Sequence, residues 1–189
     1  MTHALAWLHA RPPEPVVSVT AQDRALRVAR LDGLLLPTGR DRFAAADLVR
    51  GPDGRAASLA ADVPAGAAIA RASAVWVHTG CYRPAVPEVV VPRGRREHLP
   101  TLTVHQQRVE PGETVTIGGV LVTTLVRTAV DLARWCPLDV AAPRLRALAA
   151  VGLPVADVTA DLDRHARDAY TARARAVVAA ALTVPGGGA

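Results

Sequence analysis

Three charged side chains in residues 123–134 have a spacing at which they could act together. Asp131 follows Arg127 by four residues and precedes Arg134 by three, so on a helix its carboxylate can meet both guanidinium groups. Because buried charges must be paired, we interpret the trio as a clamp that holds a helix against a sheet, with a ligand or partner site as the alternative. Apolar residues cover most of the circumference of this helix, which predicts that it is largely buried. They are Leu125, Val126, Ala129, Val130, Leu132 and Ala133.

A second group of charged residues, all arginines, lies within the first 50 residues. The pattern predicts a helix over residues 20–33, with Thr20 as its N-cap and Gly33 at its end. A short apolar run at residues 34–36, a Pro-Thr-Gly turn and a basic turn follow, which is the order at the end of a winged helix-turn-helix. The alternative is a helix packed on a β-hairpin with solvated arginines. The candidate DNA contacts are Arg24, Arg27, Arg30, Arg40 and Arg42.

The histidines and cysteines offer one arrangement that could bind a metal. His78 and Cys81 have ligand-like spacing, and His98, His105 or Cys136 could complete a zinc site. The sequence has no C-x-x-C pair and no His-Glu-x-x-His helix, which disfavours such a site. It also lacks glycine-rich phosphate loops and the G-x-S-x-G motif of serine hydrolases. We therefore expect no catalytic residues, no metal and no cofactor.

The composition narrows the class of protein. The 189 residues carry a net charge of +5, and all 22 cationic side chains are arginines because the sequence contains no lysine. A GC-rich coding bias explains such a composition, and a phosphate-binding surface is compatible with it. Hydrophobic residues make up 50%, which excludes wholesale disorder, and no apolar run is long enough for a membrane span. With two cysteines and no secretory pattern at the start, we expect a cytoplasmic protein.

The elements that must position these residues can be predicted from periodicity and turn signals. Residues 51–55, Gly-Pro-Asp-Gly-Arg, predict a linker between a winged-helix-like region (1–50) and a mixed α/β domain (56–183), with a flexible tail at 184–189. The predicted fold class is α+β, with a small sheet and a helical C-terminal third. In the second domain we predict a helix over 66–77, strands over 86–91, 102–107 and 114–123, and helices over 125–135, 138–151, 155–167 and 169–182.

Several short motifs together resemble the AbiEi family of antitoxins and transcriptional regulators, which partner nucleotidyltransferase toxins in type IV toxin–antitoxin systems. The resemblance covers residues 62–182. Its most specific part is the Thr-Thr…Arg-Thr…Asp-Leu-Ala-Arg pattern that includes the predicted clamp. The motifs are Ile117-Gly118-Gly119-Val120, Val122-Thr123-Thr124, Arg127-Thr128 and Asp131-Leu132-Ala133-Arg134, with Ala74-Val75-Trp76-Val77-His78 and Val89-Val90-Val91-Pro92-Arg93 in support.

The resemblance implies a winged-helix domain that binds promoter DNA for autorepression, a C-terminal α/β domain associated with antitoxicity, and no catalytic residues. Some proteins of this arrangement continue into a nuclease-like domain of the very-short-patch-repair type, whose metal-dependent cleavage needs an Asp and a Glu-x-Lys-like pair. This sequence has no lysine, so we expect that domain to be absent. Two hypotheses follow: a DNA-binding regulator and antitoxin, or a stand-alone protein-interaction domain whose DNA-binding half has decayed.

Overall fold

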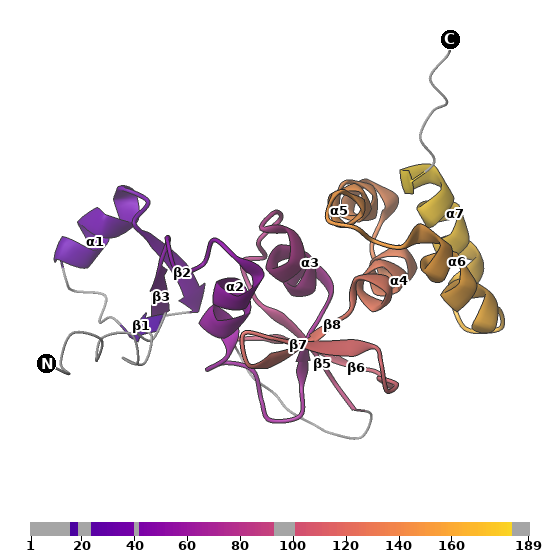
Figure 1. Ribbon diagram of the computed structural model, residues 1–189, viewed down its shortest axis with the longest axis horizontal. Helices are drawn as coiled ribbons and strands as arrows, with labels where there is room; N and C mark the ends of the chain where they lie inside the picture. The colour runs from indigo at the N-terminus through magenta and orange to yellow at the C-terminus, as the bar shows by residue number, and fades with distance from the viewer. Residues whose placement is uncertain (1–15, 19–23, 40–41, 93–100, 183–189) are drawn as a thin grey trace, which may run out of the picture.

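The computed structural model describes residues 16–18, 24–39, 42–92 and 101–182. Within these ranges the chain forms seven helices and two separate sheets, which confirms the predicted α+β class (Figure 1). The elements in chain order are β1 (Val16–Ser18), α1 (Arg24–Leu31), β2 (Leu35–Gly39), β3 (Arg42–Ala45), α2 (Pro52–Leu59), β4 (Ala68–Ile69), α3 (Arg71–Thr79), β5 (Glu88–Val91), β6 (Thr103–Gln106), β7 (Thr114–Ile117), β8 (Val120–Thr123), α4 (Leu125–Trp135), α5 (Leu138–Ala150), α6 (Val155–Arg164) and α7 (Thr171–Leu182).

The N-terminal sheet is antiparallel, with strand order β1-β3-β2, and α1 leads directly into β2. The helix ends as predicted at Gly33, which has a φ of 72° and lets the amide of Leu34 reach the Ala29 carbonyl at 2.9 Å. Strand β2 extends through residues 37–39, where the sequence predicts a turn, because these residues pair with β3. The predicted N-cap Thr20 lies outside the described residues.

Gly51 is the N-cap of helix α2 and residues 52–55 form its first turn, so the segment predicted as a linker is helical. Pro52 stands at the start of the helix, where its missing N–H costs nothing. A Cβ at Gly54 would overlap the Leu48 carbonyl oxygen. Glycine is therefore needed here because the backbone of α2 passes close to that of Leu48, and not because the segment must be flexible. Arg55 is buried and its Nε donates to the Val77 carbonyl at 3.0 Å, which ties α2 to α3.

The larger sheet is mixed, with strand order β6-β5-β4-β8-β7. Its central strand, β4, occupies the start of the segment predicted as a helix over 66–77. Ile69 is completely buried and pairs with Val89 on one side and Val122 on the other, and this pairing overrides the helix propensity of the alanines around it. The chain becomes helical only at Arg71. The predicted strands at 86–91, 102–107 and 114–123 are present, the last as the hairpin β7–β8.

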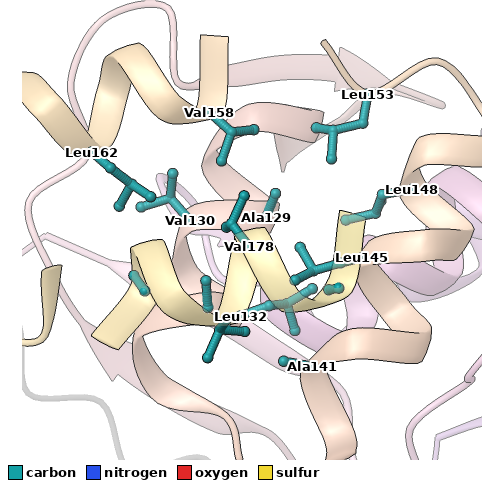
Figure 2. Close-up of a cluster of buried hydrophobic side chains, with 14 of the residues drawn as sticks. Ala129, Val130, Leu132, Ala141, Leu145, Leu148, Leu153, Val158, Leu162 and Val178 are labelled. Carbon is teal, nitrogen blue, oxygen red and sulfur yellow. The ribbon is translucent and has the colours of Figure 1, made fainter. Parts of the chain in front are cut away.

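Helices α4 to α7 form a bundle at the end of the molecule remote from α1 (Figure 1). The four predicted helices are all present, with α6 ending at Arg164 and α7 beginning at Thr171. Their shared core centres on α4, whose Ala129, Leu132 and Ala133 are completely buried. Figure 2 shows the side chains that surround α4 in this core: Leu145 and Leu148 of α5, Val158 and Leu162 of α6, and Val178 of α7. Within the described residues, no helix is long and apolar enough to cross a membrane.

Candidate functional site: an arginine-bearing helix and the polar edge of α4

Helix α1 exposes the first three of the predicted DNA contacts. Arg24, Arg27 and Arg30 follow one another at intervals of three residues and are all exposed, so they share one side of the helix. The Arg30 guanidinium lies 5.9 Å from the centre of the Phe43 ring on β3, which links the helix to the hairpin. Among the described residues, neither Arg24 nor Arg27 has an acidic partner. Both residues are exposed, so a phosphate can reach their guanidinium groups.

The other two predicted DNA contacts differ from the first three. Arg42, on β3, donates from Nη1 to Asp62 Oδ1 at 2.7 Å, and the Asp62 side chain is largely buried. This ion pair joins the N-terminal sheet to the segment after α2. The guanidinium of Arg42 is therefore engaged by a carboxylate of the protein itself. Arg40 lies outside the described residues.

The Thr-Thr…Arg-Thr pattern forms the start of α4. Thr124 is the N-cap, and its side chain accepts from the Arg127 amide at 3.2 Å. Thr123 and Thr128 are completely buried and their hydroxyls lie 2.7 Å apart. The His78 ring nitrogen Nε2 lies 2.8 Å from the Thr123 carbonyl, which joins α3 to the end of β8. The pattern that carries the family resemblance therefore fixes the junction of sheet and helix.

Arg127 and Asp131 form a buried ion pair, as the spacing predicts. Arg127 Nε donates to Asp131 Oδ2 at 3.0 Å, and only 2% of Asp131 is exposed. Arg127 also contacts the Glu113 carboxylate and donates to Gln107 Oε1 at 3.0 Å, so it ties α4 to the segment between β6 and β7. Burial raises the pKa of the Asp131 carboxyl above its usual value, and the nearby Arg127 charge opposes that rise. Arg127 is thus fully engaged within the protein.

Arg134 does not share Asp131, so that part of the predicted clamp is wrong. Its Nη2 donates to Asp168 Oδ2 at 3.2 Å and to Thr171 Oγ1 at 2.9 Å, at the start of α7. Asp131 is directed to Arg127 instead, and the loop between α6 and α7 supplies a separate carboxylate, Asp168, for Arg134. Each arginine therefore joins α4 to a different neighbour, the β6–β7 segment or α7, which supports a structural role for the stripe.

A polar pocket of about 360 Å³ opens beside this edge of α4. Five carboxylates and three guanidinium groups line it, so the pocket is locally acidic although the chain carries +5. The sequence gives no sign that Glu113 and Asp168 pair with α4, because both come from other elements and have no spacing relationship to it. The charged lining residues are Glu110, Glu113, Asp131, Asp161, Asp168, Arg108, Arg127 and Arg134.

The metal-binding arrangement considered from the sequence does not form in the part of the chain that the structure describes. No group of three His, Cys, Asp or Glu residues there is placed to hold a metal ion. His78 is committed to the Thr123 carbonyl, and burial lowers its pKa. His105 pairs instead with Glu88 at 2.8 Å, across strands β6 and β5. His98 lies outside the described residues.

Comparison with models of known protein families gives no match, and neither does comparison with curated proteins.

Proposed function

We propose that this chain is a non-enzymatic, DNA-binding transcriptional regulator and antitoxin of a type IV toxin–antitoxin system, acting in the cytoplasm. In this role it represses its own promoter and counters a nucleotidyltransferase-like toxin. The observation that carries the proposal is a pair of exposed arginines, Arg24 and Arg27, on a helix that leads directly into an antiparallel hairpin; neither arginine has an acidic partner among the described residues.

This arrangement suits a duplex in a specific way. An exposed helix enters the major groove of DNA, and guanidinium groups bind phosphates or the edge of guanine in a bidentate manner. Arg24 and Arg27 supply two such groups on one side of α1. Arg30, held over Phe43, sets the angle between the helix and the hairpin, which follows the DNA backbone as a wing.

The antitoxin half of the proposal is supported by the family resemblance of residues 117–134. The side chains of this motif are used inside the protein, at the junction of β8 with α4 and between Arg127 and Asp131. We therefore propose that the motif maintains the C-terminal domain, and that the toxin binds this domain as a folded unit. Co-purification with the product of an adjacent nucleotidyltransferase-like reading frame tests this half.

DNA binding is tested by fluorescence anisotropy with the duplex upstream of the gene, over a series of salt concentrations. The logarithm of the affinity should fall linearly with the logarithm of the salt concentration, because each phosphate contact releases a counterion. Arg24→Gln and Arg27→Gln should each reduce that slope by about 1. Arg146→Gln, at an exposed arginine on α5, is the matched control and should leave the slope unchanged. Equal slopes in all four proteins would overturn the proposal.

One observation favours the second hypothesis, a protein-interaction domain. Val28, Leu31 and Leu34 are 49%, 80% and 61% exposed and recur at intervals of three residues along and just after α1. An apolar row of this kind is typical of a surface that binds protein. If this hypothesis is correct, the duplex fails to bind even at low salt, while Leu31→Ser abolishes a complex with a neighbouring gene product. The anisotropy experiment therefore separates the two functions.

A further inference from the structure

A second pocket lies where the N-terminal sheet meets the larger domain. It has a volume of about 290 Å³ and is bounded by β2, α3 and residues 83–87. Its walls are about equally polar and apolar, and three prolines and the ring of Trp76 make up a rigid apolar part. Three polar side chains also line the pocket: Thr38, Ser73 and Arg83.

Arg83 brings a positive charge into this pocket without a counter-charge. Its guanidinium carbon lies 5.1 Å from the centre of the Trp76 ring. Among the described residues, no carboxylate lies within ion-pair distance of Arg83. Burial lowers the pKa of Arg83, with no acidic group acting against that effect. A partly buried cation of this kind is stabilised by an anion.

Thr38 brings an unpaired hydroxyl to the same pocket. The residue is only 3% exposed, and its buried Oγ1 has no hydrogen-bond partner among the described residues. Ser73 is completely buried, and its Oγ accepts from the Glu88 amide at 2.7 Å, which leaves its own hydrogen to donate. A buried hydroxyl without a partner is unfavourable, so native proteins rarely keep one unless something binds it.

We propose that this pocket binds a small organic monocarboxylate with an apolar body. The carboxylate lies against Arg83 and accepts a hydrogen bond from the Thr38 hydroxyl, while the body packs on Trp76 and the prolines. One cation matches a single negative charge better than a phosphate dianion. The volume lies at the lower end of the range for small-molecule sites, which starts at about 300 Å³, so the ligand is small.

The pocket lies between the N-terminal sheet and the larger domain, so a bound ligand contacts both. Thr38 belongs to β2, in the sheet that carries α1, whereas Ser73 and Trp76 belong to α3 of the larger domain. A bound carboxylate therefore bridges the two parts of the chain. An effect of the ligand on DNA affinity rests on the proposed function, but binding itself does not, so the test is made without DNA.

The experiment is equilibrium dialysis of the full chain against benzoate, phenylacetate and hexanoate, with benzamide and inorganic phosphate for comparison. We expect at least one carboxylate to bind with one molecule per chain and to raise the melting temperature. Arg83→Gln should weaken this binding at least 10-fold. Thr38→Val, which keeps the shape of the side chain and removes the unpaired hydroxyl, should fold at least as stably as the wild type and bind more weakly. Arg146→Gln is the exposed-arginine control and should bind as the wild type does.

The proposal is overturned if none of the three carboxylates binds at 10 mM or below, on the order of the weakest affinities of specific sites. It is also overturned if benzamide binds as tightly as benzoate, since the charge would then be irrelevant. If phosphate binds as well as the carboxylates, the pocket holds an adventitious ion only. Retention of binding in both Arg83→Gln and Thr38→Val would place the ligand elsewhere.

Discussion

Replacement of Arg127 by methionine tests whether the polar stripe of α4 holds the C-terminal domain together. The change removes the guanidinium and keeps a flexible apolar side chain of similar reach. Asp131, of which 2% is exposed, would then lose the only cation that donates a hydrogen bond to it among the described residues. Gln107 and Glu113, on the β6–β7 segment, would lose their contacts to α4 in the same step.

The size of the effect follows from the burial of the pair. The Arg127 side chain is 11% exposed and that of Asp131 3%, so solvent screens their attraction little. Removing one partner of a buried pair costs about 3–5 kcal/mol, because the other charge stays buried and unpaired. For a chain of this length, such a loss lowers the melting temperature by roughly 6–20 °C. Exposed ion pairs contribute only about 0–1 kcal/mol, which gives a clear contrast.

The assay is urea unfolding of the wild type, Arg127→Met, Arg127→Met/Asp131→Leu and a control, Arg175→Met. Arg175 also forms a 2.8 Å ion pair, with Asp163, but both side chains are substantially exposed, so its loss should cost less than about 1 kcal/mol. The double variant should recover at least about half of the loss, because it removes the unpaired carboxylate as well.

The acid side of the pH profile gives an independent check on this reasoning. Without Arg127, burial and the Glu113 charge are opposed only by the more weakly acting Arg71 charge, so the folded pKa of Asp131 rises further above the unfolded value. The folded variant then binds more protons than the unfolded chain, so its free energy of unfolding rises as pH falls through the folded pKa. The deficit of Arg127→Met relative to the wild type should therefore shrink towards pH 5. A loss below about 1 kcal/mol that is independent of pH would refute the buried-pair reasoning.

Two further predictions concern the junctions around the sheet. Burial, reinforced by the Arg55 charge, lowers the folded pKa of His78. Below about pH 6.5 the unfolded chain therefore binds a proton that the folded chain does not, and the free energy of unfolding should fall as pH drops. His78→Gln should reduce the difference between the free energies of unfolding measured with urea at pH 5 and pH 7.5. Gly118 has a φ of 54° and its Cβ would overlap the Asp53 carbonyl oxygen, so Gly118→Ala should cost about 2–5 kcal/mol. Gly119→Ala, with positive φ but open space, should cost only about 1–2 kcal/mol, and equal thermal shifts in the two variants would contradict the packing argument.

The elements that the sequence predicts well are those whose signals are local. Helix α4 has its N-cap at Thr124 and a continuous apolar surface, and its observed bounds are the predicted ones. The hairpin β7–β8 turns at Gly118 and Gly119, both with positive φ, which the pair of glycines predicts. In each case the residues that determine the structure lie within a few positions of one another.

The errors arise where distant residues decide the local structure. Gly54 reads as part of a flexible linker, yet it is a helical residue pressed against Leu48. Ile69 lies in an alanine-rich segment with helical propensity, yet its two neighbouring strands make it the centre of a sheet. In both cases the contacts that decide the structure come from residues that the local pattern does not reveal. Periodicity and turn rules therefore could not predict the helix at Gly54 or the strand at Ile69.

The same limit applies to the charged residues, and there it bears on function. The pairing of Arg127 with Asp131 is a helix-spacing effect and was predictable, whereas the pairing of Arg134 with Asp168 spans 34 residues and was not. In such pairs the arginine charge is balanced by a carboxylate within the protein. The pocket beside α4 is lined by more carboxylates than guanidinium groups, so the net charge of +5 does not describe that surface. Among the described residues singled out for DNA binding, unpaired charge remains on α1 at Arg24 and Arg27. If the proposed function is correct, the described residues place DNA affinity on Arg24 and Arg27 of that helix, whereas the net charge of the chain points to no particular surface.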